Sequence, residues 1–487
     1  MKDRGSELDS QYYADGRPPL LNHKAAYDVE TIAHALTNIY RRNVDVDHDI
    51  EPYLYEETQR IMDEAIAEGY ANAAENNIPT PDEAFRNAFS HSADVFSAFR
   101  VHKMQTDIAS QMLDSDGHLK PFSKFVKDVS PYIEHRNRAW LQTEYDTAII
   151  RAQNAAEWQQ FQTEKDVFPN LEWIPSTSPN PGADHQVFWG TVLPVDHPFW
   201  NEHKPGDRWN CKCELRQTDR DATPVPTSDG KSDPAPGLES NPATDREPFS
   251  DRHPYYPSGC SSCPFAGNRL VALVHDLAGR GKHCNDCVKA NQKIEKAENY
   301  KQWEQNKADY KKYNADPDYR DVDFNEKTGG LKARHKDHNK NKKGNKIDGL
   351  TPFQIEKEFQ DNIFDMGGSC ILENEKIKRA NGSIAKCLDI KLNGVLMDIR
   401  TISQATTKIE NALTDKHKQL VIHNKDFNDK ASTVCLYFHT PSYYSAEKIQ
   451  SGITNYQRIM ANKKETCAIK KVIVVINGEK KILEFDL

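Results

Sequence analysis

A long apolar run and an apolar leader are both missing from this sequence of 487 residues. A helix that crosses a bilayer needs about 20 consecutive apolar residues, and no stretch of the chain approaches that length. The opening residues, MKDRGSELDSQYYADG, are polar and lack the apolar centre of a secretory signal. We therefore expect a protein without a membrane partner that is made in the reducing cytosol.

The chain also has fewer basic than acidic residues: 64 Lys and Arg residues against 73 Asp and Glu residues give a net charge of −9. This balance argues against a general nucleic-acid coat, which needs cations to neutralise phosphates. One segment departs from it: the stretch from Lys327 to Lys346 holds eight Lys or Arg residues and a single acid, Asp337. Two interpretations stay open for this run, a solvated linker and an edge that attracts phosphate.

With 37% hydrophobic and 28% charged residues, the chain has the composition of a globular protein with modest cores. Its length suits two to four domains. Shifts in composition along the chain predict a multidomain fold with a mainly α N-terminal region. The α region carries a loop-rich α+β subdomain after Phe168, where Pro, Asn, Gly, Asp and Trp dominate. The predicted segments are a helical domain at 1–220, a Pro/Ser/Asp-rich flexible linker at 221–252, a small zinc knuckle at 253–292, a charged helical connector at 293–326 and an α/β domain with a mixed sheet at 327–487.

The α/β domain has the clearest local signals. Thr351-Pro-Phe-Gln354 is a capping-box helix start, and Asn393-Gly394 and Asn477-Gly478 are hairpin turns. Between the two turns we expect a helix over 406–419, strands over 420–423 and 433–439, and a helix marked by Ile449, Ile453, Tyr456 and Met460.

Ten cysteines are present, and four of them form two CxxC pairs separated by twenty residues: Cys260 with Cys263, and Cys284 with Cys287. Each CxxC turn presents two thiolates to one ion, and zinc takes four such ligands in a tetrahedron. The four cysteines therefore predict a structural zinc site that stabilises a segment too small to fold alone. The single cysteines, Cys370, Cys387, Cys435 and Cys467, are expected to be buried small hydrophobes.

A long motif lies upstream, within residues 138–217. It comprises a helix from Arg138 to Arg151, then Ala183-Asp184-His185, then Gly190-Thr-Val-Leu-Pro-Val-Asp196-His-Pro-Phe-Trp200, and then Trp209-Asn-Cys211-Lys-Cys213. This pattern resembles the phage Mu F-like head morphogenesis family, the minor head proteins that accompany the portal. The resemblance implies a role in head assembly, phage portal and head proteins as partners, and a place in the virion or in the host cytoplasm during assembly.

Asp184, His185, Cys211 and Cys213 of this motif have metal-ligand chemistry, so a CxC pair and a histidine could hold zinc. The alternative is a hydrogen-bonded knot that fixes a loop-rich fold around Trp200 and Trp209. The sequence favours the knot, because the family resemblance implies no enzymatic role.

The C-terminal domain admits two catalytic interpretations. In the first, Asp389, Asp398 and Arg400 resemble the P-D-(D/E)-x-K nuclease pattern, in which two acids on neighbouring strands bind a divalent ion such as magnesium. Glu356 and Glu358 on the preceding helix are candidate extra ligands. The departure is Arg400, because the pattern has lysine there and arginine does not give up its proton.

In the second interpretation the domain is a metal-free ribonuclease. The layout from Gly329 resembles the barnase, colicin and RelE-like domains found at the ends of phage head proteins, and also the tRNA-cleaving C-terminal toxins of contact-dependent inhibition. His335 would then be the general acid or base, with phosphate held by Lys332, Arg334 and Lys336. A third interpretation is a purely structural head protein whose C-terminal domain binds DNA or a partner without catalysis.

The sequence as a whole predicts a minor head protein with a C-terminal domain that cleaves nucleic acid. RNA is the expected substrate, with tRNA as one candidate.

Overall fold

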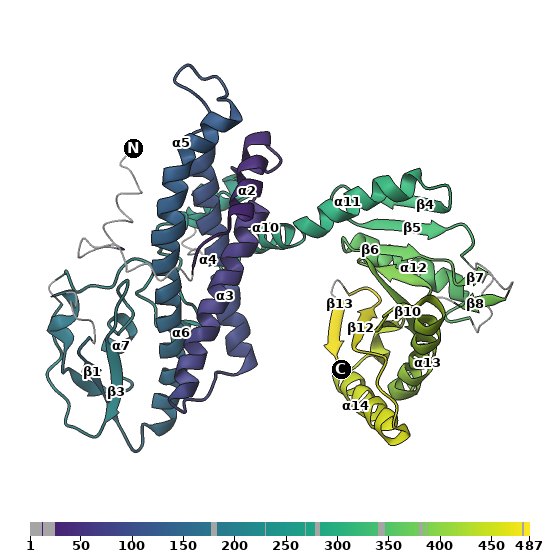
Figure 1. Ribbon diagram of the computed structural model, residues 1–487. Helices are drawn as coiled ribbons and strands as arrows, with labels where there is room; N and C mark the ends of the chain where they lie inside the picture. Colours follow the sequence, from purple (N-terminus) through teal and green to yellow (C-terminus); the bar gives the residue numbers. More distant parts are fainter. Residues whose placement is uncertain are drawn as a thin grey trace. The chain divides into compact units, whose positions relative to one another are not determined.

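The computed structural model describes Tyr12 and residues 25–176, 183–228, 230–267, 269–277, 283–338, 346–378, 383–386, 388–479 and 482–487. The chain forms two compact units, Met1–Glu298 and Asn299–Leu487 (Figure 1). Each unit has its own hydrophobic core.

Long helices form the first unit: α2 (Val29–Arg41), α3 (Pro52–Glu75), α4 (Glu83–Ala109), α5 (Phe122–His135) and α6 (Leu141–Glu164). A π-helical turn, Arg136–Trp140, leads from α5 into α6. The apolar stripes of these helices meet in one core that includes Phe89, Phe96 and Trp140. Helices α3 and α6 approach closely at Gly69, where a Cβ atom would clash with the carbonyl oxygen of Ile149.

The loop-rich subdomain follows α6. Its elements are β1 (Asn170–Ile174), the 3₁₀ helix η2 (Ala183–Phe188), β2 (Val192–Pro194), α7 (Phe199–Glu202) and β3 (Glu214–Thr218). The three strands form an antiparallel sheet in the order β2-β1-β3, and a small core gathers around Trp173, Phe188 and Trp200. These features confirm the predicted mainly α region with a loop-rich α+β subdomain.

The later part of the segment expected to be a flexible linker, 221–252, is packed against the helices instead, since buried residues begin at Ser232 while residues 221–228 include none. Leu238 and Phe249 are buried in the helical core, and the Arg151 guanidinium of α6 donates to the carbonyl oxygens of Leu238 and Ser240 at 3.0 and 2.9 Å. Because a fully buried guanidinium needs acceptors, this chain segment has a fixed place, and a composition rich in Pro, Ser and Asp did not reveal it.

The zinc-knuckle segment is likewise part of the first unit. Its elements, with the short helix before them, are α8 (Pro242–Asp245), the 3₁₀ helix η3 (Cys260–Ser262), α9 (Arg269–Leu277) and α10 (Val288–Glu298). Ala290 and Ile294 of α10 are buried in the helical core, and α10 contacts α3 and α4. The predicted connector at 293–326 is therefore divided between the two units at Glu298.

The second unit is built on an eight-stranded sheet in the order β13-β12-β11-β10-β9-β6-β5-β4. Its strands are β4 (Tyr319–Phe324), β5 (Leu331–His335), β6 (Ser369–Leu372), β9 (Ile390–Leu392), β10 (Val395–Thr401), β11 (Thr433–Phe438), β12 (Lys471–Ile476) and β13 (Ile482–Asp486). Strands β10, β11 and β12 run parallel, as do β5 and β6, and the other neighbours are antiparallel. A separate hairpin joins β7 (Lys376–Lys378) to β8 (Ile384–Lys386). This arrangement confirms the predicted α/β domain with a mixed sheet.

Helices cover both faces of the sheet. Helix α12 (Pro352–Asp365) packs with Cys435 and Tyr437 of β11 on one face. Helices α13 (Ile409–Phe427) and α14 (Ala446–Lys463) pack with Val434, Leu436 and Phe438 on the other. Because alternate residues of a strand point to opposite faces, β11 is apolar on both sides and lies inside the unit.

Local signals in this unit behave as predicted in most places. The capping box of Thr351 and Gln354 is present, and Asn393-Gly394 joins β9 to β10 with positive φ at both residues. The strand predicted over 420–423 is wrong, because α13 continues to Phe427. Leu413, Leu420 and His423 are buried on one side of this helix, and their helical spacing outweighs the short apolar run.

The second unit also begins earlier than the predicted boundary at 327. Helix α11 (Tyr300–Ala315) packs on β4 and β5. The Asn306 side chain of this helix donates to the carbonyl oxygens of Gly329 and Gly367 at 2.8 and 3.2 Å. Those two bonds attach α11 to the sheet.

Candidate functional site

A buried cluster of His185, Cys211 and Cys213 lies in the loop-rich subdomain. Nδ1 of His185, from η2, is 3.3 Å from Sγ of Cys211 and 3.8 Å from Sγ of Cys213, both in the segment that enters β3. On the other side of the ring, Nε2 is 2.6 Å from Oδ1 of Asp207. All four side chains are nearly or fully inaccessible to solvent.

The cluster is strongly polarised. Burial alone would lower the pKa of His185, but the hydrogen bonds with Asp207 and Cys213 raise it to about 10. The hydrogen bond from Cys211 and then the contact with His185 hold the pKa of Cys213 well below its usual range. An imidazole beside a thiolate in a buried place is a soft N/S donor set, which suits zinc among the metals common in proteins. Sequence reasoning named three of these residues and missed Asp207, which is separated from His185 along the chain.

Other residues of the motif serve the framework. Trp209 packs against Tyr12 with ring centroids 4.5 Å apart and joins the helical core. Asp196 is exposed and pairs with Lys165 at 2.9 Å. The indole N–H of Trp200 donates to the carbonyl oxygen of Pro194 at 2.9 Å. The motif is thus divided, with one part forming the His185 cluster and another fixing turns and core.

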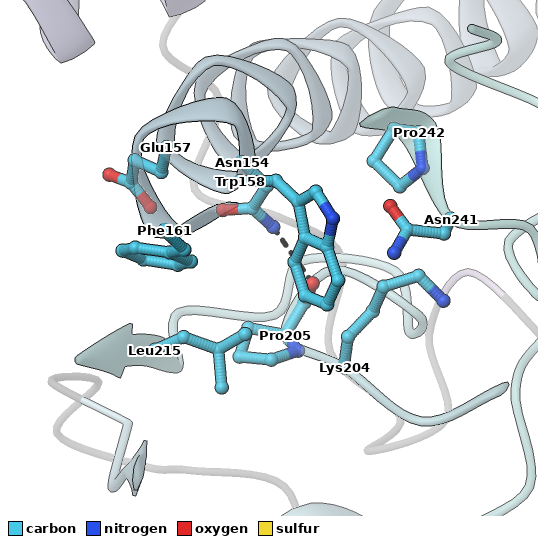
Figure 2. A pocket seen from close by; sticks show the side chains of 9 residues that line it. All are labelled: Asn154, Glu157, Trp158, Phe161, Lys204, Pro205, Leu215, Asn241 and Pro242. Atoms are coloured by element: carbon cyan, nitrogen blue, oxygen red, sulfur yellow. Dashed lines mark hydrogen bonds between the residues drawn. The ribbon is translucent and has the colours of Figure 1, made fainter. Parts of the chain in front are cut away.

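A small pocket lies beside this subdomain (Figure 2). It is lined by Asn154, Glu157, Trp158, Phe161, Lys204, Pro205, Leu215, Asn241 and Pro242. Burial and then the charge of Arg151 lower the pKa of Lys204 to about 7. Lys204 also connects the pocket to the cluster, because its backbone N–H donates to Oδ2 of Asp207 at 3.2 Å.

The four CxxC cysteines lie at η3 and just before α10. The Asp276 carboxylate accepts hydrogen bonds from the backbone N–H groups of Cys260 and Ser261, both at 2.9 Å. Burial raises the pKa of Cys263 to about 11, and the neighbouring Cys287 and Cys260 thiols act in the same direction. Among the described residues, the groups of side chains whose candidate ligand atoms all lie within 4.8 Å of one another do not include these four cysteines. Their zinc site therefore stays a prediction.

In the second unit, one of the predicted acids, Asp398, meets a lysine that sequence reasoning missed. Nζ of Lys416 on α13 lies 2.8 Å from Oδ2 of Asp398 on β10. Burial, and after it the charge of Asp389, raise the pKa of Asp398 to about 7. Oδ1 of Asp389 also accepts a hydrogen bond from the backbone N–H of Ile399 at 3.2 Å. Arg400 is exposed at the end of the same strand.

Glu358 lies away from these acids, because α12 packs on the opposite face of the sheet from α13. Its Oε1 accepts a hydrogen bond from the Tyr437 hydroxyl and lies 2.7 Å from Nδ1 of His439. Nε2 of His439 is 3.4 Å from Oδ2 of Asp348. Glu356 is also elsewhere: it belongs to a buried group with His338 and Glu375.

The basic motif on β5 is largely ion-paired within the unit. Three pairs account for its cations: Lys332 with Asp361 at 3.1 Å, Arg334 with Asp321 at 3.0 Å and Lys336 with Asp318 at 2.5 Å. Nδ1 of His335 accepts a hydrogen bond from the backbone N–H of Asp337 at 3.1 Å. Strand β5 is separated from β10 in the sheet by β6 and β9. The predicted catalytic residues are therefore spread over three places, and residues 339–345 of the basic run lie outside the described residues.

Comparison with known proteins gives one match. Residues 115–216 match the family described as Phage Mu protein F like protein. The matched range contains α6, His185 and the CxC pair, so it supports the resemblance carried by the motif at 138–217. No curated protein and no solved structure matches the chain. Within the described residues, no helix has both the length and the apolar character that a bilayer span requires.

Proposed function

We propose that this chain is a minor head protein that acts in the assembly of a phage head, near the portal vertex. The match of residues 115–216 to the Phage Mu protein F like family carries this proposal. The partners would be the portal and other head proteins, and the site of action the virion or the host cytoplasm during assembly.

The test is genetic and morphological. Deleting the coding sequence from the phage that carries it should reduce the yield of DNA-filled heads seen by electron microscopy, and a plasmid copy should restore them. Mass spectrometry of purified particles should detect the chain in few copies. Normal heads after deletion, together with absence of the chain from particles and proheads, would rule the proposal out.

We also propose that the second unit hydrolyses phosphodiester bonds with the help of a divalent ion. The observation in favour is that Asp398 pairs with Lys416 at 2.8 Å and has the carboxylate of Asp389 as a neighbour. A carboxylate on β10 and one just before β9 are suitable ligands for magnesium, and the ion would polarise the phosphate and activate water. Lys416 would take the part that the sequence pattern assigned to Arg400, namely orienting the attacking water or stabilising developing charge.

The metal-free ribonuclease has weaker support, because the cations around His335 are already paired with acids of the same unit. The purely binding interpretation predicts no cleavage under any condition. Both alternatives are outcomes of the same assay.

The assay uses the full chain with tRNA and with duplex DNA, in magnesium and in chelator. Cleavage in magnesium should fall by about 100-fold or more in Asp398→Asn and Lys416→Met, since ion placement contributes several kcal/mol to such reactions. Asp415→Asn is the matched control, because Asp415 is an exposed acid on the same helix. Activity that survives chelator and disappears in His335→Ala would establish the metal-free type, and absence of cleavage in the wild type would leave only binding.

We further propose that Cys260, Cys263, Cys284 and Cys287 hold a structural zinc ion in the first unit. The two CxxC turns support it, as does the packing of Cys263, Cys284 and Cys287 on one core. The ion would stabilise the η3–α9 segment against the helices. Metal analysis of the Cys260→Ser/Cys263→Ser variant tests it, with loss of one zinc ion per chain as the expected result and an unchanged zinc content as the contrary one.

A further inference from the structure

We propose that His185, Cys211 and Cys213 form a second zinc site, independent of the four CxxC cysteines. The ligand atoms of these three side chains all lie within 4.8 Å of one another, and all three side chains are buried. They come from two segments separated along the chain, η2 and the approach to β3. An ion at this point would crosslink two loops of the subdomain that have little regular structure of their own.

The distances suit a tetrahedral ion. Zinc binds sulfur at about 2.3 Å and nitrogen at about 2.0 Å, which places neighbouring ligand atoms roughly 3.5 Å apart. The two observed distances from Nδ1 of His185 to the cysteine sulfurs, 3.3 and 3.8 Å, lie on either side of that value. The soft donor set favours zinc over magnesium or calcium, which prefer oxygen ligands.

Asp207 gives the arrangement a second feature typical of metal centres. Histidine ligands of metals usually donate their other ring N–H to a carboxylate or carbonyl, which fixes the tautomer and makes the coordinating nitrogen a better donor. Here Oδ1 of Asp207 lies 2.6 Å from Nε2 of His185. When an ion displaces the proton of Nδ1, the remaining N–H on Nε2 would face Asp207 and Nδ1 would be available to the ion. Asp207 is fully buried, and its other oxygen accepts the backbone N–H of Lys204.

The competing explanation is the hydrogen-bonded knot, in which the same side chains hold one another without an ion. Both explanations agree with a buried, ordered cluster, and they differ in metal content. They also differ in the expected effect of removing the Asp207 carboxylate. If Asp207 positions a zinc ligand, its removal should weaken zinc binding by about 10–100-fold, whereas the knot binds no zinc at all.

The first experiment measures zinc per chain in the full-length protein after expression in zinc-supplemented medium and exhaustive dialysis. The Cys260→Ser/Cys263→Ser variant isolates the proposed site and should keep one zinc ion per chain, whereas zinc-free protein in this background would overturn the proposal. Adding Cys211→Ser and Cys213→Ser to that variant should remove the remaining ion. Adding Cys435→Ser instead is the matched control, because Cys435 is a buried cysteine of the second unit, and it should leave the zinc content unchanged.

A second measurement covers the case in which the variant with all four Cys→Ser substitutions does not fold. Cobalt loaded into the Cys260→Ser/Cys263→Ser protein should give a thiolate-to-cobalt charge-transfer band and the visible bands of tetrahedral cobalt. Asp207→Asn in the same background should keep the bands and shift the cobalt titration to about 10–100-fold weaker binding. Absence of the charge-transfer band in the folded protein would overturn the proposal. The outcome is independent of the four-cysteine site, because the two sites are emptied by different substitutions.

Discussion

Three buried polar side chains of the helical core meet at Glu144. Its carboxylate pairs with the Arg100 guanidinium and accepts hydrogen bonds from the hydroxyls of Tyr12 and Tyr255 at 3.0 and 2.6 Å. Both members of the ion pair are almost completely inaccessible to solvent. Removing one partner of such a pair leaves a buried charge without compensation.

We therefore expect Glu144→Ala to lower the free energy of unfolding of the first unit by about 3–5 kcal/mol, measured by chemical denaturation of the full chain. Glu64→Ala is the control, since Glu64 pairs with Arg60 on an exposed helix face. Such exposed pairs contribute about 0.3–0.5 kcal/mol. Equal effects of the two substitutions would contradict the role assigned to Glu144.

His253 makes the stability of the same core depend on pH. Its ring lies against Tyr12, whose hydroxyl is 3.0 Å from Nε2. Burial, and after it the charge of Arg100, lower the pKa of His253 to about 3. The folded protein keeps this histidine neutral, while the unfolded chain protonates it near pH 6.5. The stabilising contribution is complete above pH 6.5 and is lost as the pH falls toward 3.

Between pH 7 and pH 5 this linkage should lower the free energy of unfolding by about 2 kcal/mol. Asp94 and Glu247, whose pKa values burial raises to about 7, act in the opposite direction over that range. The measurement is therefore the difference between wild type and His253→Asn at each pH. That difference should shrink on acidification, and a constant difference would show that His253 does not carry the dependence.

Among the elements, α12 begins with a cap that can be tested alone. The backbone N–H of Gln354 donates to Oγ1 of Thr351 at 3.3 Å, and Oε1 of Gln354 accepts the backbone N–H of Thr351 at 2.8 Å. Thr351→Ala removes the hydroxyl and should lower the free energy of unfolding of the second unit by about 1 kcal/mol. Thr351→Ser keeps the hydroxyl and should change it by only a few tenths. A serine variant as unstable as the alanine variant would point to the lost methyl group instead of the cap.

At the scale of the whole molecule, the division at Glu298 predicts which fragment folds. A fragment of residues 299–487 contains α11 and all eight strands of the sheet, so it should unfold cooperatively in denaturant. A fragment that begins at 327 lacks α11 and β4, which cover Leu331 and Ala333 of β5. It should be less stable and bind more of a hydrophobic dye. Equal stability of the two fragments would instead support the domain boundary at residue 327 that the sequence predicts.

How far the sequence alone reached is clearest in the second unit. The cap at Thr351, the Asn393-Gly394 turn and the helix marked by Ile449 and Met460 all depend on residues a few positions apart, and all were predictable. The last turns of α13 were predicted as a strand, because a short apolar run fits a strand and a buried helix face equally well. Composition likewise gave no sign that Leu238 and Phe249 would be buried by helices far away in the chain.

The candidate sites divide in the same way. His185, Cys211 and Cys213, the CxxC pairs, and the acids Asp389 and Asp398 were recognisable from residue type and spacing. Only the tertiary structure brought Asp207 to His185 and Lys416 to Asp398, and put Glu358 on the other face of the sheet beside His439. The sequence by itself determined local geometry and the inventory of reactive groups, since these depend on neighbouring residues. Which groups meet was decided by long-range packing of helices on the sheet, which no local pattern encodes.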